Sequence, residues 1–306
     1  MARIQANTVS SRQSDAPPPL RLANMTQPTI SARGMDFTVR RAGQAGEPVL
    51  LLHGFPETSA MWAGVMAALA GAGYRCAAPD QRGYSPGARP REVESYRHEE
   101  LVGDVVAVAD ALGFGRFHLV AHDWGAAIAW LVAIAAPSRL ASLTVLSIPH
   151  YHAFAEGTWT DPAVEDYRNF LALVLAPDGA AERVLGQDHL AVFRALLTGH
   201  SAAEQEQLVA VLDQPGALSA ALAWYRASDG HRRILSAAPE PVTVPTLLIM
   251  GRDEPYAGPL AVALGEKIPI ADYRRVDLDA GHWLVQERPA EVTQAIVDQL
   301  RRYPIS

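Results

Sequence analysis

The segment Phe117–Ala136 places the strongest constraint on the fold. It opens with a short, unbroken apolar run of strand-forming residues, continues as a longer alanine-rich run, and ends before Pro137. The first run is typical of a buried strand and the second of a helix. Between them, the small residues Ala121 and Gly125 flank Asp123 with the spacing of a nucleophile elbow, a tight turn that presents one side chain at the edge of a parallel sheet. The sequence therefore predicts a strand, a sharp turn with Asp123 at its tip, and a helix.

A carboxylate at this turn indicates a particular chemistry. A serine would need a base to remove its proton before it attacks, whereas an aspartate is already ionised near neutral pH and can attack a saturated carbon directly. The product would be an ester of Asp123, and water activated by a histidine would have to hydrolyse it. An exposed aspartate that only caps the following helix is the alternative. The turn alone leaves both interpretations open.

Composition narrows the class of protein. The chain has 306 residues, 49% of them hydrophobic, which is enough for a large α/β domain with an insertion. The formal net charge is -7 and the charges are scattered, so no basic surface for nucleic acid is expected. Cys76 is the only cysteine, which excludes an intramolecular disulfide and fits a reducing compartment. With no apolar run of membrane-spanning length and no secretory signal, we expect a soluble cytoplasmic protein.

Three regions follow from the pattern along the chain. Residues 1–33 are predicted to be a disordered leader, because they are rich in polar residues and proline and lack apolar periodicity. Residues 34–149 and 240–306 alternate strands with helices and predict a doubly wound, mostly parallel sheet, an α/β fold. Residues 150–239 contain helical stretches without a convincing strand and predict an inserted helical cap. The expected strands are 37–41, 49–52, 75–79, 117–121, 143–147, 246–250 and 273–276, and the expected helices are 58–72, 99–112, 125–136, 167–175, 190–197, 202–212, 216–227, 260–267 and 289–302.

Four motifs then carry a resemblance. They are His53-Gly54-Phe55-Pro56, His122-Asp123-Trp124-Gly125, Trp224-Tyr225-Arg226 and Gly281-His282-Trp283. Over roughly residues 34–303, the chain resembles the α/β-hydrolase superfamily, within its epoxide hydrolase family, the branch with an aspartate nucleophile that is related to the haloalkane dehalogenases. The resemblance implies the α/β-hydrolase fold with a helical cap.

The resemblance also assigns roles around Asp123. It implies that His282 is the general base and that the backbone N–H groups of Phe55 and Trp124 form an oxyanion hole. The triad acid would be Glu254, which stands three residues after a glycine, where the family usually has aspartate. Asp253 is the alternative. Either carboxylate would hold the imidazole in the required tautomer and stabilise its cation.

A phenol in the cap is the remaining expectation. Opening an epoxide leaves a strongly basic alkoxide, so a tyrosine must donate a proton to the ring oxygen. The resemblance places Tyr225 in this role, although a tyrosine in such a helix is more often a packing residue. A second tyrosine is typical of the family, but the family spacing falls on Phe170 or Leu171. We assign Tyr167, one turn upstream, and keep Tyr151 as the alternative.

Together these features predict a cofactor-independent enzyme that opens a small-molecule epoxide to a vicinal diol. Its partners are the epoxide substrate and water. We expect it to bind no metal, nucleic acid or membrane, and a homodimer is one option for its oligomeric state. The first alternative is a haloalkane dehalogenase, for which Trp124 is present but the usual Asn is replaced by Phe55. A non-catalytic ligand-binding member of the fold is the second. His150 and His152 lack a third ligand at metal-binding spacing, so we expect them to lie in a loop or pocket wall.

Overall fold

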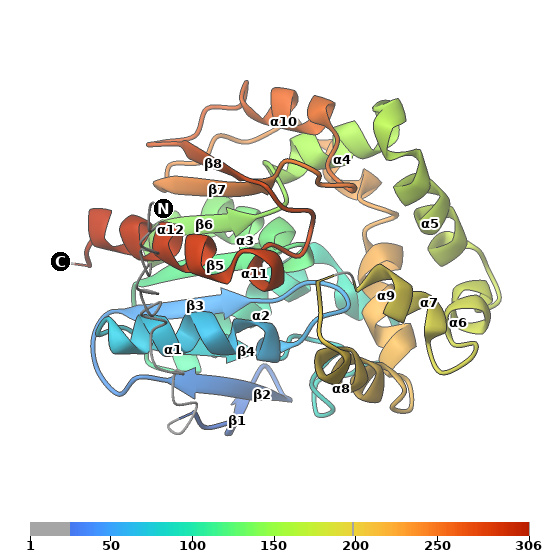
Figure 1. Ribbon diagram of the computed structural model, residues 1–306, viewed down its shortest axis with the longest axis horizontal. Helices are drawn as coiled ribbons and strands as arrows, with labels where there is room; N and C mark the ends of the chain where they lie inside the picture. Colours follow the sequence, from blue (N-terminus) through green and yellow to red (C-terminus); the bar gives the residue numbers. More distant parts are fainter. Residues whose placement is uncertain (1–24, 198, 306) are drawn as a thin grey trace, which may run out of the picture.

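A computed structural model of the protein describes residues 25–197 and 199–305. Its core is an eight-stranded, mostly parallel sheet in the order β1-β2-β4-β3-β5-β6-β7-β8, with α1 and α12 on one face and α2 and α3 on the other (Figure 1). The strands are β1 (Thr29–Ala32), β2 (Met35–Ala42), β3 (Pro48–Leu52), β4 (Arg75–Pro79), β5 (Phe117–His122), β6 (Leu140–Leu146), β7 (Thr246–Gly251) and β8 (Arg274–Leu278). This is the α/β-hydrolase arrangement that the sequence predicts.

Helices connect these strands and fill the long interval between β6 and β7. The helices are α1 (Ala63–Gly71), α2 (His98–Ala111), α3 (Trp124–Ala135), α4 (Tyr151–Thr160), α5 (Glu165–Leu175), α6 (Ala180–Leu185), α7 (Ala191–Leu196), α8 (Ala202–Leu212), α9 (Ala217–Ala227), α10 (Pro259–Gly265), α11 (Leu284–Glu287) and α12 (Pro289–Arg302). Single 3₁₀ turns lie at Ser59–Trp62, Val93–Tyr96, Pro137–Arg139, Pro162–Val164 and Arg232–Ser236.

The prediction of a disordered leader is wrong for the last residues of the range 1–33. Thr29–Ala32 form β1, which pairs antiparallel with β2 so that Ile30 lies opposite Phe37. A strand of four residues is too short to show a periodic pattern of apolar residues. It is recognised as a strand only by its pairing with β2, which the local sequence does not reveal. The rest of the leader prediction, residues 1–24, lies outside the described residues.

Residues 150–239 form the inserted helical segment, which contains α4 to α9. No strand occurs in its described residues, 150–197 and 199–239, in agreement with the sequence pattern. The helices α4, α6 and α11 were not predicted. Figure 1 shows the segment at one end of the sheet, beside the carboxyl ends of the parallel strands. The boundaries of the segment as a domain remain a prediction.

The register of the central strands determines where the elbow lies. Strand β5 is fully buried and runs parallel between β3 and β6, with Ala121 opposite Leu52 on β3 and Val145 on β6. A strand covered on both faces is expected to be continuously apolar, which explains the run in the sequence. Because parallel strands end at the same edge, the loops that follow β3, β5, β6 and β7 converge there. This edge is where open α/β sheets bind ligands.

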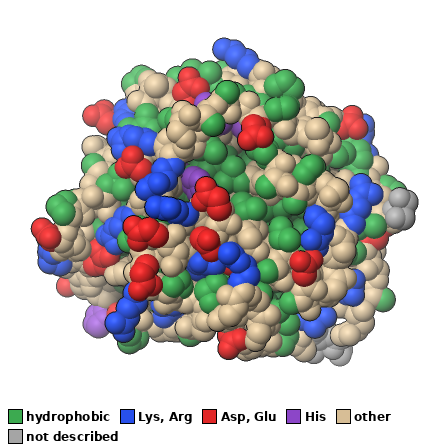
Figure 2. All heavy atoms as spheres, turned by 180° about the vertical axis from the view of Figure 1, so that it is seen from behind, with side chains coloured by type: hydrophobic (Ala, Val, Ile, Leu, Met, Phe, Trp, Pro, Cys, Tyr) green, Lys and Arg blue, Asp and Glu red, His purple; other side chains and the backbone are tan. Residues whose placement is uncertain are grey.

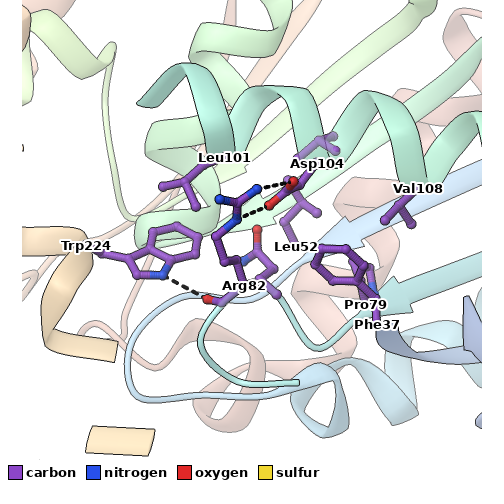
Figure 3. Close-up of a pocket in the computed structure, with 10 residues that line it drawn as sticks. Phe37, Leu52, Pro79, Arg82, Leu101, Asp104, Val108 and Trp224 are labelled. Atoms are coloured by element: carbon purple, nitrogen blue, oxygen red, sulfur yellow. Dashed lines mark hydrogen bonds and ion pairs between the residues drawn. The ribbon is translucent and has the colours of Figure 1, made fainter. Parts of the chain in front are cut away.

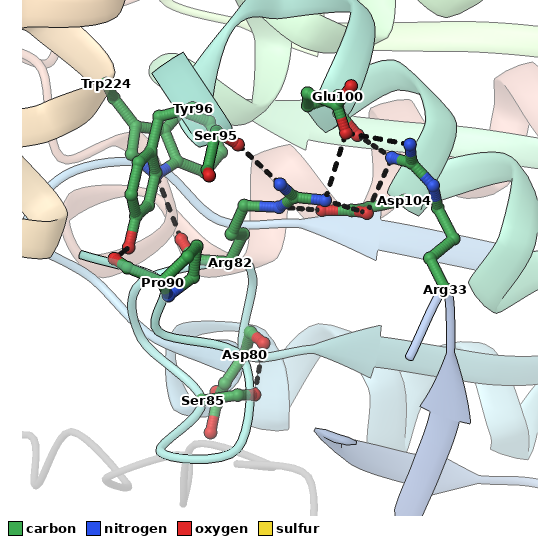
Figure 4. A network of polar contacts seen from close by, with 10 residues as sticks. All are labelled: Arg33, Asp80, Arg82, Ser85, Pro90, Ser95, Tyr96, Glu100, Asp104 and Trp224. Carbon is green, nitrogen blue, oxygen red and sulfur yellow. Dashed lines mark hydrogen bonds and ion pairs between the residues drawn. The ribbon is translucent and has the colours of Figure 1, made fainter. Parts of the chain in front are cut away.

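A buried ion pair joins the loop after β4 to α2, and a hydrogen bond from α9 joins the same loop to the inserted helical segment. Both guanidinium and carboxylate are almost completely buried, and Arg82 donates two hydrogen bonds of 2.6 Å to Asp104 on α2 (Figure 3). Arg33 and Glu100 extend the network towards β1 (Figure 4). The indole N–H of Trp224, on α9, donates to the carbonyl of Arg82 over 2.9 Å. The loop after β4 is thereby fastened to α2 on one side and to α9 on the other.

The molecular surface carries mixed charge. On the face in Figure 2, basic side chains lie next to acidic ones without an extended region of one sign. In the described part of the chain, each helix is too short or too polar to cross a bilayer.

We expect Arg82→Met to destabilise the fold strongly. Burial raises the pKa of Asp104 even though Arg82 and Arg33 oppose this, so the carboxylate depends on its arginine partners. Removing one partner of a buried pair costs about 3–5 kcal/mol, which chemical denaturation would measure as a lower urea midpoint. Asp110→Asn is the control, because it removes the exposed partner of Arg139 and should cost less than about 1 kcal/mol. Equal losses in the two variants would contradict this prediction.

Candidate active site

The elbow after β5 holds Asp123 in a strained backbone conformation. Its φ of 52° and ψ of -124° lie in a region that non-glycine residues rarely adopt. The turn is possible because neighbouring backbone passes very close to it. A Cβ atom at Gly54 would stand 2.2 Å from Asp123 Oδ1, and one at Gly125 would stand 2.5 Å from the carbonyl oxygen of His53. Glycine is therefore required at both positions for the elbow to form in this place.

The two oxygens of the Asp123 carboxylate have different surroundings. The backbone N–H of Phe55 donates to Oδ1 over 2.7 Å, while Oδ2 faces the imidazole of His282 at 3.6 Å from Nε2. Burial raises the pKa of Asp123, whereas His282 and the backbone N–H groups of Trp124 and Phe55 favour the ionised form. Phe55 and Trp124 thus direct their N–H groups to the carboxylate, as an oxyanion hole at this position requires.

His282 lies between Asp123 and Glu254. Its Nδ1 is 3.0 Å from Oε1 and 2.9 Å from Oε2 of Glu254, so Nδ1–H donates to the carboxylate and Nε2 is left to face Asp123. Burial alone would lower the pKa of His282, but the charges of Glu254 and Asp123 outweigh burial and raise it. A neutral imidazole held this way directs its unprotonated nitrogen at the Asp123 carboxylate, which is the geometry that a general base at this position would need.

The structure brings Glu254, not Asp253, to the histidine. Glu254 is buried to 2% exposure of its side chain and also accepts a hydrogen bond from the backbone N–H of Tyr256 over 3.0 Å. Asp253 is exposed, and its backbone N–H bonds to the carbonyl of Ala280. The extra methylene of glutamate relative to the expected aspartate is accommodated by this loop.

A cavity of about 280 Å³ lies between the sheet edge and the inserted helical segment. Asp123 and His282 form part of its wall, and Tyr167 and Tyr225 reach it from α5 and α9. The full lining consists of Phe55, Pro56, Asp123, Ala163, Asp166, Tyr167, Phe170, Phe193, Tyr225, Pro255, Tyr256, His282 and Trp283. Five of the seven predicted site residues, all but Glu254 and Trp124, thus line one cavity. The cavity is mostly apolar, with a few convergent polar groups, as is typical of ligand sites.

The lining of the cavity distinguishes between the candidates for the second cap tyrosine. Tyr167 and Phe170 both line the cavity, with their rings stacked at 6.3 Å between centroids. Leu171 is fully buried and is not part of the lining. Tyr151 lies behind the cavity wall, where its hydroxyl bonds to His98 and His231. A phenol at the cavity therefore comes from Tyr167, not from the position that the family spacing indicates.

Several residues that support the site were not identified from the sequence. His122 Nε2–H donates to the carbonyl of His282 over 2.9 Å, and the hydroxyl of Ser147 donates to the same oxygen over 3.1 Å. The ring of Tyr256 stands edge-on to that of His282, with centroids 4.7 Å apart. His122 lies inside the elbow motif and could have been suspected, whereas no sequence signal points to Ser147 or Tyr256.

His53 orients the loop that carries Phe55. Its Nε2 accepts the backbone N–H of Gln81 over 3.0 Å, and its Nδ1–H donates to the carbonyl of Gly54 over 2.9 Å. Both ring nitrogens are thus used to join the loop after β3 to the loop after β4. This explains why histidine precedes Gly54: the ring supplies one acceptor and one donor to buried backbone groups.

The histidines near the start of α4 have structural contacts. The ring of His150 accepts the backbone N–H of His152, and His152 Nε2–H donates to the carbonyl of Ala237 over 2.9 Å. Across residues 25–197 and 199–305, no group of three or more His, Cys, Asp or Glu side chains is arranged to hold a metal ion.

Comparison with known proteins places the chain in a family. Residues 47–289 match the alpha/beta hydrolase fold family. The chain is 31% identical to epoxide hydrolase A of Mycobacterium tuberculosis over 90% of this chain and 97% of that protein. It is 32% identical to human epoxide hydrolase 4, over 87% of this chain and 76% of that protein. A Bacillus megaterium epoxide hydrolase solved with an inhibitor shares the fold, with a TM-score of 0.81 and 24% identity, over 90% of this chain and 100% of that one.

These matches cover the sheet, the inserted helical segment and the site. The chain therefore belongs to the α/β-hydrolase superfamily and, within it, to the epoxide hydrolase family.

We expect Glu254→Gln to lower the pKa of His282. The charge of Glu254 is the main influence that keeps this pKa above its ordinary value of 6.5, so the imidazole should lose its proton at a lower pH in the variant. NMR titration of the histidine side chains would measure the direction of this change. Asp253→Asn removes the exposed neighbouring carboxylate and should leave the titration unchanged. An unaltered His282 titration in the Glu254 variant would refute the assignment of Glu254.

Proposed function

We propose that the protein is an epoxide hydrolase that converts an epoxide to a vicinal diol through an ester of Asp123. The observation that carries this proposal is the single cavity in which Asp123 and His282 face Tyr167 and Tyr225. A nucleophile, a base and phenolic proton donors are what ring opening followed by ester hydrolysis requires. The relatives named epoxide hydrolase, matched over most of their length, support the same activity.

In the first step, Oδ2 of Asp123 attacks a ring carbon of the epoxide. The carbon–oxygen bond of the ring breaks, and its electron pair moves to the ring oxygen, which takes a proton from Tyr225 or Tyr167. Oδ1 is held by Phe55, so the carboxylate presents Oδ2 to the substrate. Burial and the charge of Asp123 raise the pKa of Tyr167, and burial together with Tyr167 and Asp123 raises that of Tyr225, so both remain protonated and can act as acids.

In the second step, His282 removes a proton from water and the resulting hydroxide adds to Cγ of the ester. The oxyanion that forms would be stabilised by the backbone N–H groups of Phe55 and Trp124. When the intermediate collapses, the leaving oxygen takes the proton from His282. The other hydrogen of the water stays on the regenerated carboxyl group of Asp123 and is then lost. The atoms of one epoxide and one water are thereby combined in the diol.

Dehalogenation is supported less well. Trp124, which would have to bind a halide, packs its ring against His231 and Tyr225, with centroids 4.6 and 5.1 Å away, and does not line the cavity. Phe55 contributes an apolar side chain to that wall where a halide would need a donor. The phenols of Tyr167 and Tyr225 have no evident use in releasing a halide, which leaves as an anion without a proton.

We expect His282→Gln to accumulate the covalent intermediate. The nucleophile remains, so the ester forms, but no base activates the water that should remove it. Mass spectrometry after incubation with styrene oxide should show one epoxide added, located by peptide mapping to Asp123. His282→Gln combined with Asp123→Asn should show no addition. Absence of the adduct, with the wild-type protein still forming diol, would mean that water opens the ring directly.

We expect Tyr225→Phe to slow ring opening. Loss of a general acid lowers the rate about 10²- to 10⁴-fold when no other donor replaces it, and Tyr167 would limit the loss to the lower part of that range. Single-turnover kinetics with excess enzyme would measure the rate. Tyr84→Phe is the matched control, because Tyr84 is equally buried but lies outside the cavity lining. A rate in Tyr225→Phe as fast as in the control would exclude Tyr225 as the acid.

A further inference from the structure

Behind the cavity wall, four side chains form a continuous chain of hydrogen bonds. The hydroxyl of Tyr167 is 2.7 Å from Nε2 of His231, Nδ1 of His231 is 3.1 Å from the hydroxyl of Tyr151, and this hydroxyl is 2.9 Å from Nε2 of His98. We call these residues the 167–98 chain. They come from four places in the fold: α5, the turn after α9, the start of α4 and the start of α2. The sequence gives no sign that they meet.

The 167–98 chain extends from the cavity to the surface. Tyr167 lines the cavity, and His231 and Tyr151 are each 1% exposed. His98, the first residue of α2, is partly exposed, and its Nδ1 makes no hydrogen bond with another described residue. One end of the chain therefore reaches the substrate and the other reaches water.

Every member of the 167–98 chain can accept one proton while it gives up another. A phenol and a neutral imidazole each combine a donor with an acceptor. Burial lowers the pKa of His231 to about 3 and that of His98 to about 4, so both rings are neutral at physiological pH. Among the described residues, neither ring donates to a backbone carbonyl, a contact that would end the path. His53 and His152, by contrast, each donate to such a carbonyl.

His231 is held in place independently of the chain. Its backbone has a φ of 73°, and its N–H donates to the hydroxyl of Ser228, which itself donates to the carbonyl of Tyr225. Its ring stacks on Trp124 with 4.6 Å between centroids. The turn after α9 thus fixes the imidazole between the two phenols. If the ring of His231 served only for packing, it would not need a hydrogen-bond partner at each of its two nitrogens.

We propose that Tyr151, His231 and His98 relay protons between solvent and Tyr167 during turnover. This proposal rests on the proposed function, because it supplies the proton that ring opening consumes. The three residues do not touch the substrate and act through Tyr167.

During ring opening the relay runs inwards. Tyr167 gives its proton to the ring oxygen and receives one from Nε2 of His231. Nδ1 of His231 then takes the proton of Tyr151, and Tyr151 takes one from Nε2 of His98, which gains a proton at Nδ1 from water. Each residue ends with its original number of protons, while both imidazoles have changed tautomer.

After ester hydrolysis the relay runs outwards. The proton left on Asp123 passes through cavity water to Tyr167, and the transfers reverse until His98 releases a proton from Nδ1. The original tautomers are restored. One proton has entered and one has left, so the conversion of epoxide and water to diol remains balanced.

The relay avoids a buried phenolate. Burial and the nearby charge of Asp123 raise the pKa of Tyr167 well above its ordinary value, because a negative charge there is poorly solvated. Without a second proton source, Tyr167 would carry this charge until bulk water entered the cavity. Reprotonation through His231 removes the charge as it forms.

Tyr151→Phe tests the interior of the relay. The substitution removes one hydroxyl and keeps the ring, while Tyr167 keeps its bond to His231. We expect single-turnover ring opening to slow by about tenfold or more, with KM unchanged and a larger solvent deuterium isotope effect. A loss of thermal stability without these kinetic changes would indicate a purely structural role and overturn the proposal.

His98→Ala tests the entry point. We expect about a tenfold lower rate, which is below the roughly 10²- to 10⁴-fold contribution of a group that transfers a proton directly to the substrate, because His98 acts only through Tyr167. We also expect recovery of about half of the rate or more when imidazole is added to the buffer. His152→Ala is the control, because this histidine is also partly exposed and its side chain bonds to the carbonyl of Ala237, not to a member of the 167–98 chain. Its rate should be normal and insensitive to imidazole.

The outcomes separate the two proposals. If the wild-type protein forms no diol from any epoxide, the proposed function fails. If it forms diol while Tyr151→Phe and His98→Ala behave like His152→Ala, only the relay is refuted.

Discussion

The backbone of Asp123, held at a φ of 52°, is the constraint on which the site depends. Such a conformation costs about 1–3 kcal/mol in a non-glycine residue and persists only where the surroundings impose it. Here the buried strand β5 enters the turn, α3 leaves it, and Gly54 and Gly125 allow the adjacent backbone to approach within the space of a missing Cβ atom. The carboxylate consequently meets the N–H of Phe55. Had the turn relaxed, neither that donor nor His282 would be within reach.

Electrostatic balance around His282 follows from this placement. One imidazole stands between two carboxylates in a region that excludes most water, so burial and charge act on it in opposite directions. Glu254, at 2.9 Å, binds Nδ1 and favours one tautomer, while Asp123 lies 3.6 Å from Nε2. His122 and Ser147 fix the carbonyl of the histidine from the sheet side. The two carboxylates therefore make different contacts with the same imidazole.

The inserted helical segment is coupled to the sheet by polar contacts as well as by apolar packing. Trp224 binds the carbonyl of Arg82, whose guanidinium is paired with Asp104 on α2. His98, also on α2, bonds to Tyr151 on α4. Helix α2 is therefore linked to α9 and to α4 through separate networks, and these networks help to position the inserted helices over the sheet edge that carries Asp123.

Local patterns in the sequence were sufficient for the alternation of strands and helices and for the elbow with Asp123, because these depend on residues close together in the chain. The loop that carries His282 was identified from the resemblance to the epoxide hydrolase family. The sequence favoured Glu254 over Asp253 and Tyr167 over Tyr151, but it did not exclude the alternatives. Those choices depend on which way a loop or helix turns its side chains once it packs against distant elements. Strand β1 was missed for the same reason, since its partner defines it. Only the tertiary structure decided which polar groups meet, because a hydrogen bond between residues far apart in the chain produces no periodic pattern in the amino-acid sequence.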